Sequence, residues 1–155
     1  KGWDAAIKRV CTWGKFRIKS TAEVIWVFNT HFDHRGEKAR AQSVKLIMKM
    51  IREKVDQADP VLLMGDLNLR PETSPIQWLS SEMNDARYCE KCAVLGPEET
   101  WNGFQNDENN SGNRIDYIFT SQNIRVKKYA VFTQLTGGRF NSDHFPVYIK
   151  FDLYR

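Results

Sequence analysis

Histidine, acidic and amide side chains occur in four short groups along the chain, each at the end or the start of an apolar stretch. These groups are His31 with Asp33, Asp66 with Asn68, Asp116, and Asp143 with His144. Two imidazoles, several carboxylates and an amide indicate hydrolysis by an activated water and not a covalent intermediate. A histidine with an ordinary pKa of about 6.5 can accept a proton from water at neutral pH, and a carboxylate partner fixes its tautomer.

The same groups supply ligands for a metal ion. Carboxylate oxygens predominate over thiols and imidazoles, which favours a hard cation such as Mg²⁺ or Mn²⁺. Such a cation binds through one or two carboxylates together with phosphate oxygens of a substrate. The predicted substrate is therefore a phosphate ester.

The elements that position these groups begin with two strands and a helix. Residues 12–18 and 23–30 are rich in β-branched and aromatic residues around a polar turn, which predicts a hairpin. Apolar residues recur at helical spacing over 37–56, and the apolar run at 61–65 predicts a further strand. A strand, a helix and a second strand in this order predict a crossover with parallel neighbours.

The second half of the chain is predicted to contain a short helix and three more strands. The helix covers about 76–81, after two prolines, and residues 105–113 are polar enough for a surface loop. The strands are expected at 114–120, 125–133 and 145–153. The pattern favours a mixed sheet with helices on its face, in the α/β or α+β class.

The four groups can meet only if the strands alternate in direction. His31 and Asp66 lie at the carboxyl ends of their strands, where open sheets place binding crevices. Asp116 and His144 lie at the beginnings of theirs, so antiparallel placement would bring all four groups to one edge.

Structural roles remain open for individual members of these groups. Asp116 could pair with Arg114, Asn68 could make an Asx-turn before a proline, and Asp143 could cap a turn. Each of these structural roles is plausible for a single residue. It is much less expected that all four groups would come together at one edge by accident.

Composition limits the class of protein. The 155 residues are 41% hydrophobic, and the excess of 23 basic over 19 acidic residues gives a net charge of +4. A chain of this length can bury about 70% of its unfolded surface, which excludes wholesale disorder. The longest apolar run, residues 24–28, is far shorter than the roughly 18 residues of a membrane span. The charge permits a polyanionic substrate without indicating one.

Cys11, Cys89 and Cys92 cannot all pair within one chain. The spacing of Cys89 and Cys92 suits a redox or zinc site, but no second Cys/His pair completes one. We therefore expect free thiols, which weakly favour a reducing, cytoplasmic compartment. The chain begins at Lys1 without an initiator methionine or signal, so an upstream part is expected to be absent and localisation stays unknown.

Four segments together resemble a known family. They are Asn-Thr-His-Phe-Asp-His at 29–34, Gly-Asp-Leu-Asn at 65–68, Arg-Ile-Asp-Tyr-Ile-Phe at 114–119 and Ser-Asp-His-Phe-Pro-Val at 142–147. In order and spacing they resemble the endonuclease/exonuclease/phosphatase superfamily, and Thr-Trp-Asn-Gly-Phe at 100–104 is similar to a segment often found before the third. The resemblance implies a four-layer sandwich of two mixed β-sheets flanked by helices, with a Mg²⁺-dependent phosphoesterase site at the sheet edges.

The resemblance also implies catalytic roles. His144 would be the general base, oriented by Asp116. Asp66 and Asn68 would position the attacking water and a phosphate oxygen, and His31 would bind the phosphate or assist departure of the leaving group.

Binding roles follow in the same way. Asp143, together with Asp66, would hold the metal. Arg9 resembles an arginine that some members direct at the phosphate, and Asn68 and Trp101 complete the substrate-binding set.

Family members open with a strand bearing an Asn and soon afterwards a Glu that is the principal metal ligand. Both would precede Lys1, so residues 1–155 are expected to form a single, N-terminally incomplete domain whose partner is the missing segment or a chain that replaces it. The predicted function is metal-dependent hydrolysis of phosphate esters, as a phosphodiesterase, nuclease or phosphatase. The alternative is a catalytically inactive fragment or binding module that retains the fold.

The sequence does not choose between nucleic acid and a small phosphate ester as substrate. Trp101 and Phe104 could stack on a base, but the loop that follows carries Asp107 and Glu108 and no basic residue before Arg114.

Overall fold

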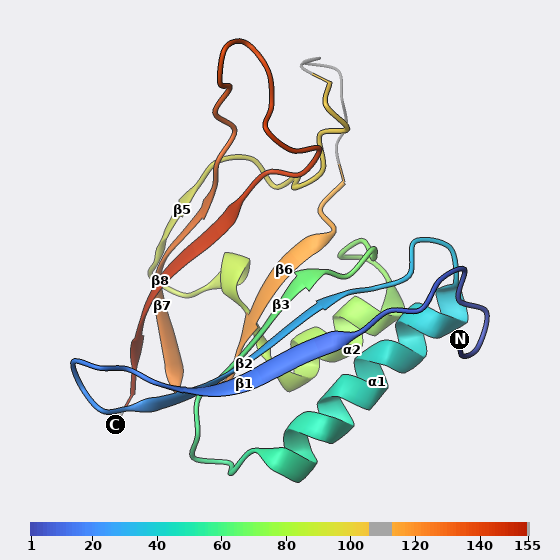
Figure 1. Cartoon of the computed structure of the whole chain (residues 1–155). Helices are drawn as coiled ribbons and strands as arrows, with labels where there is room; N and C mark the ends of the chain where they lie inside the picture. Colours follow the sequence, from blue (N-terminus) through green and yellow to red (C-terminus); the bar gives the residue numbers. More distant parts are fainter. Residues whose placement is uncertain (106–112, 155) are drawn as a thin grey trace.

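The computed structural model describes residues 1–105 and 113–154. The predicted polar loop at 105–113 therefore lies, apart from its two ends, outside the described residues. The described residues form two mixed β-sheets and two α-helices (Figure 1).

The larger sheet has five strands in the order β1-β2-β3-β6-β4. Their bounds are Cys11–Arg17 for β1, Val24–His31 for β2, Val61–Asp66 for β3, Asp116–Thr120 for β6 and Asn84–Asp85 for β4. The antiparallel pairing of β1 with β2 confirms the predicted hairpin, and the parallel pairing of β2 with β3 confirms the crossover. β6 is antiparallel to β3, which is the direction that the edge prediction requires.

The smaller sheet has three strands in the order β5-β7-β8. They span Ala93–Leu95, Ile124–Val131 and Val147–Leu153. β5 is parallel to β7, whereas β8 is antiparallel to it. The last three strands were thus predicted in the right places, with bounds differing by one or two residues.

Two helices cover one face of the larger sheet (Figure 1). α1 is Glu37–Lys54 and α2 is Ser74–Glu82, both close to the predicted ranges. Val44 and Ile47 of α1 are buried in one cluster with Phe28 of β2 and Leu63 of β3, because the apolar stripe of the helix faces the apolar side chains of the strands.

A second core lies between the two sheets. Ile25 of β2 and Leu62 of β3 project from the opposite face of the larger sheet and join Val126 and Tyr129 of β7 in a buried cluster. Strands β2 and β3 are therefore covered on both faces, as their nearly continuous apolar sequences predicted. The two packed mixed sheets agree with the sandwich that the resemblance implied. Among the described residues, however, α-helices cover only the larger sheet, so three of the four expected layers are seen: helix, sheet and sheet.

The expectation of free thiols at Cys89 and Cys92 is wrong, because the two cysteines form a disulfide. They follow a 3₁₀ helix, Ala86–Tyr88, in a turn where Lys91 has a φ of 56°. This turn brings the two Cα atoms to 5.8 Å, within the range for a disulfide. The argument from free thiols for a reducing compartment is lost, although Cys11 is free.

The first residues of the chain are attached to the start of α1 by two carboxylates. Asp4 accepts hydrogen bonds from two N–H groups of the first helical turn. Asp33 is buried and accepts the N–H groups of Gly36 at 2.7 Å, Arg35 at 2.9 Å and Ile7 at 3.0 Å. These bonds, that of Gly36 first, hold the pKa of Asp33 well below its usual range. Asp33 thus has a structural role and does not join His31.

Among the described residues, no helix is both long and apolar enough to span a bilayer.

Candidate active site

Three neighbouring strands bring their polar residues to one edge of the larger sheet. In the register of β2, β3 and β6, Asp66 lies opposite His31 on one side and Asp116 on the other. Gly65 permits this close approach, since its φ is 133° and a Cβ there would lie 1.9 Å from the carbonyl oxygen of Thr30. The sequence prediction of a shared edge is confirmed for His31, Asp66 and Asp116.

His144 reaches the same edge from the other sheet, in the segment just before β8. Its Nδ1 lies 2.7 Å from Oδ2 of Asp116, and its Nε2 lies 3.9 Å from Oδ2 of Asp66. With Nδ1–H donated to Asp116, Nε2 carries the lone pair. The ring is about a quarter exposed, so solvent can reach it.

The charges around His144 favour its protonated form. Burial lowers the pKa of His144. The hydrogen bond to Asp116 and the negative charges of Asp116, Asp66 and Asp143 together raise it by more than burial lowers it, so the pKa lies above its ordinary value. The surroundings therefore stabilise the cation that forms when this imidazole accepts a proton.

Asp66 is the central carboxylate of the site. Its Oδ2 lies 3.2 Å from Nε2 of His31, and its Oδ1 accepts the N–H of Asn68 at 2.8 Å. Burial, and to a smaller extent the charge of Asp116, raise the pKa of Asp66. The hydrogen bond from the Asn68 N–H and the two histidines lower it by less, so the pKa stays above its ordinary value. The bond from the Asn68 N–H makes Asp66 the acceptor of an Asx-type turn. The alternative considered from sequence, in which Asn68 makes such a turn, is therefore wrong.

Asn68 is held in a fixed orientation. Its backbone has a φ of 49°, in the left-handed region where Asn is tolerated best after Gly. Its Nδ2 donates to the carbonyl of Phe32 at 3.0 Å, and Nδ2 also lies 3.4 Å from Oδ2 of Asp66. The amide oxygen of Asn68 is thereby directed away from the Phe32 carbonyl.

Thr100 connects the two halves of the site, a role that the sequence did not reveal. It is fully buried, and its Oγ1 accepts the N–H groups of Ile115 and Asp116, both at 3.0 Å. Its carbonyl accepts the N–H of Phe145 at 2.6 Å. Thr100 therefore fixes the backbone of Asp116 and of the residue after His144. The Thr-Trp-Asn-Gly-Phe segment was the available signal, but it did not indicate these partners.

The remaining predicted residues lie around this group without joining it. Trp101 is half-buried and forms a β-bridge with His144. The carboxylate of Asp143 is outside the group of close ligand atoms within the described chain, although its charge acts on His144. Arg9 is half-buried before β1, and its Nε has no hydrogen-bond partner among the described residues.

Two of the alternative roles considered from sequence are also wrong. Arg114 pairs with Asp85 and not with Asp116. The turn before His144 is capped by Ser142, whose Oγ accepts the His144 N–H, and not by Asp143.

Asp66, Asp116 and His144 could hold a metal ion. One ligand atom of each lies within 4.8 Å of those of the other two. Two carboxylates and one imidazole are a donor set that hard divalent cations accept. The arrangement places a possible proton acceptor, His144, beside carboxylates that could hold a cation.

Comparison with known proteins assigns the chain to a family. The model of the endonuclease/exonuclease/phosphatase family matches residues 10–144, a range that includes all four chemical groups. The chain belongs to this family. Enzymes of the family act on phosphate esters and generally use divalent metal ions.

Solved structures of family members agree with the fold. A family protein from Bacteroides vulgatus is 32% identical with a TM-score of 0.88, covering 99% of this chain and 59% of that one. A mannosyl-6-phosphatase from Bacteroides thetaiotaomicron is 34% identical with a TM-score of 0.83, covering 98% and 60%. A second family protein from that organism is 34% identical with a TM-score of 0.85, covering 100% and 59%. No curated protein matches the chain.

This chain therefore spans about three-fifths of the length of these family members.

Proposed function

We propose that the domain containing this chain is a metal-dependent hydrolase of phosphate esters in which His144 activates the attacking water. The hydrogen bond between His144 and Asp116, beside Asp66, carries this proposal. Asp116 holds Nδ1–H, so Nε2 accepts a proton from a water placed near Asp66. The imidazolium that results faces two carboxylates, which offset the cost of its charge.

A divalent cation such as Mg²⁺ or Mn²⁺ fits the oxygen-rich donor set of this edge. Asp66 would hold it, and the family resemblance implies Asp143 as a second ligand, although in this structure the Asp143 carboxylate lies outside the close group of Asp66, Asp116 and His144. When bound, it would supply positive charge opposite the phosphate oxygens.

His31 and Asn68 would act on the phosphate group itself. The ring of His31 is more than half exposed beside Asp66, where it can bind a phosphate oxygen or protonate the leaving group. The amide of Asn68 is fixed by its bond to Phe32 and would orient a phosphate oxygen or the water. Arg9 would supply a further positive charge, and Trp101 would contact the substrate beside His144.

A small phosphate ester is the substrate class we favour over nucleic acid. The 34% identity with a mannosyl-6-phosphatase over 98% of this chain supports a sugar phosphate. We also propose that the complete domain includes residues beyond this chain, because it spans only about 60% of that relative. Activity is accordingly a property of the complete domain.

The test is an assay of the full-length protein against a sugar phosphate, bis-nitrophenyl phosphate, DNA and RNA, with and without Mg²⁺. His144→Ala should lower kcat by about 10² to 10⁴ because a positioned general base is lost. His34→Ala is the control, since His34 is an exposed histidine with no role in the proposed mechanism and its replacement should leave kcat unchanged. Asn68→Ala should also lower kcat.

Two results would contradict the proposal. Near-normal turnover by His144→Ala at neutral pH would exclude His144 as the base. Absence of Mg²⁺-dependent turnover with every ester, after the complete domain is shown to be folded, would favour the inactive binding module.

A further inference from the structure

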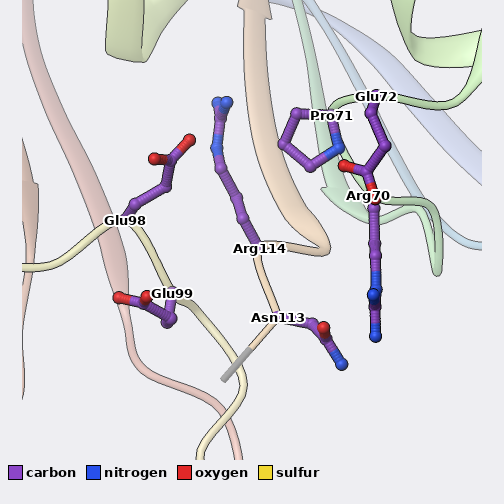
Figure 2. Close-up of a pocket in the computed structure, with 7 residues that line it drawn as sticks. All are labelled: Arg70, Pro71, Glu72, Glu98, Glu99, Asn113 and Arg114. Atoms are coloured by element: carbon purple, nitrogen blue, oxygen red, sulfur yellow. The ribbon is translucent and has the colours of Figure 1, made fainter. Parts of the chain in front are cut away.

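A cavity lies where the chain leaves β3 after Asn68 and where it enters β6 before Asp116. Segments 70–72, 98–99 and 113–114 line it, and its volume is about 620 Å³ (Figure 2). Cavities of about 300 to 1,000 Å³ are typical of small-molecule sites. We call it the Arg70 pocket.

The walls of the Arg70 pocket continue the segments that carry the catalytic candidates. Arg70 follows Asn68 by two residues, and Arg114 precedes Asp116 by two. The N–H of Leu67 donates to the carbonyl of Ile115 at 2.8 Å, so the segments after β3 and before β6 are still hydrogen-bonded where they leave the sheet.

The third wall is also tied to the site. Glu99 directly precedes Thr100, whose hydroxyl accepts the N–H of Asp116. The carbonyl of Asn113 accepts the N–H groups of Thr100 and Trp101, both at 3.1 Å. A group bound in the pocket would thus be held at a fixed position relative to Asp116.

Contacts of Arg114, which is buried, and of Tyr88, which is at the surface, order the back of the pocket. The Arg114 side chain is 1% exposed, pairs with Asp85, and stacks over the rings of Tyr117 at 4.5 Å and Tyr88 at 5.3 Å. The hydroxyl of Tyr88 donates to Oε1 of Glu98 at 2.8 Å. These contacts hold the Glu98 carboxylate in place before any ligand arrives.

The polar groups of the pocket combine donors and acceptors. Arg70 and Asn113 extend in a similar direction, whereas Glu99 lies beyond Asn113 and its carboxylate points away from both (Figure 2). A hydroxyl group can donate to a carboxylate while it accepts from a guanidinium or an amide. Such a lining matches a molecule with several hydroxyl groups.

The charge of the pocket disfavours a polyanion. Glu72, Glu98 and Glu99 contribute three carboxylates, and Arg114 is already neutralised by Asp85, so Arg70 alone faces them among the lining residues. A second phosphate or a nucleic-acid strand placed here would be repelled, since nucleic-acid binding depends on an excess of basic side chains.

We propose that the Arg70 pocket binds the leaving group of the phosphate ester, and that this group is a neutral or cationic molecule rich in hydroxyl groups, such as a sugar. The inference rests on the proposed function, because the phosphate would lie at the edge formed by Asp66 and His144. Arg70, Glu99 and Asn113 are then specificity-determining residues and take no part in proton transfer.

The experiment compares two substrates of the full-length protein, a hexose 6-phosphate and p-nitrophenyl phosphate, whose leaving group lacks the hydroxyl groups of a sugar. Glu99→Gln and Arg70→Met should each lower kcat/KM for the hexose phosphate by about 10-fold or more, because a hydrogen bond to a charged group is lost. Both should leave kcat/KM for p-nitrophenyl phosphate within about 2-fold. Glu90→Gln is the matched control, as Glu90 is exposed and outside the pocket.

Equal losses for both substrates, or no loss for either, would overturn the subsite while leaving the proposed function standing. If the wild-type protein hydrolyses neither these two esters nor any ester of the assay above, the proposed function has failed, and binding of free glucose decides the subsite. Shifts of the Glu99 and Asn113 amide signals in a ¹H–¹⁵N NMR titration with glucose, absent in Arg70→Met, would support it. Unchanged signals in the wild type would refute it.

Discussion

Replacing Thr100 by valine removes one hydroxyl group and leaves the shape of the side chain almost unchanged. In the native structure this hydroxyl accepts the N–H groups of Ile115 and Asp116, and the residue is fully buried. Valine cannot accept either bond, so two partly buried N–H groups lose their acceptor. At about 1 to 3 kcal/mol for each unsatisfied donor, the free energy of unfolding should fall by about 2 to 6 kcal/mol.

Urea unfolding followed by circular dichroism measures this loss. Thr100→Ser is the control because serine keeps the oxygen and loses only a methyl group, which should cost about 1 kcal/mol. If Thr100→Val and Thr100→Ser had the same stability, the hydroxyl would not be the acceptor of these two N–H groups. The account of how Asp116 is positioned would then be wrong.

Three further predictions concern charge and sulfur. Because the pKa of Asp33 is lowered in the folded chain, its carboxylate stabilises the fold above about pH 4, and this stabilisation is lost as the pH falls toward the folded-state pKa. The free energy of unfolding, measured between about pH 4 and about pH 2, should therefore decline less steeply in Asp33→Asn than in the wild type. Asp85→Ala should cost about 3 to 5 kcal/mol in urea unfolding because Arg114 is left buried and unpaired, whereas adding Arg114→Met should recover part of the loss. Iodoacetamide should modify only Cys11 in the unfolded, unreduced chain and all three cysteines after reduction, as mass spectrometry would show; three labels without reductant would refute the disulfide.

Much of the fold could be predicted because its elements are encoded locally. The apolar run of β3 and the helical spacing in α1 needed no knowledge of distant residues. The shared edge of Asp66 and Asp116 could also be predicted, on the condition that their strands are antiparallel, and the pairing of β3 with β6 meets this condition.

Features that depend on distant or backbone partners could not be predicted in this way. Asp33 was grouped with His31 by proximity in sequence, but the N–H groups at the start of α1 and at Ile7 determine its role. The partner of Arg114 is Asp85, 29 residues away, and no spacing pattern indicates such a pair. The spacing of the two disulfide cysteines was compatible with several states, and only the conformation of the turn decides among them.

The contact between His144 and Asp116 crosses from one sheet to the other. Besides the local bonds of Thr100, the relative position of these side chains therefore depends on packing at a distance, through Ile25, Leu62 and Tyr129 in the layer between the sheets. A shift of one sheet against the other by about 1 Å would lengthen the 2.7 Å bond beyond hydrogen-bonding distance. Substitutions that loosen the core between the sheets should therefore displace His144 from Asp116 before they unfold the chain.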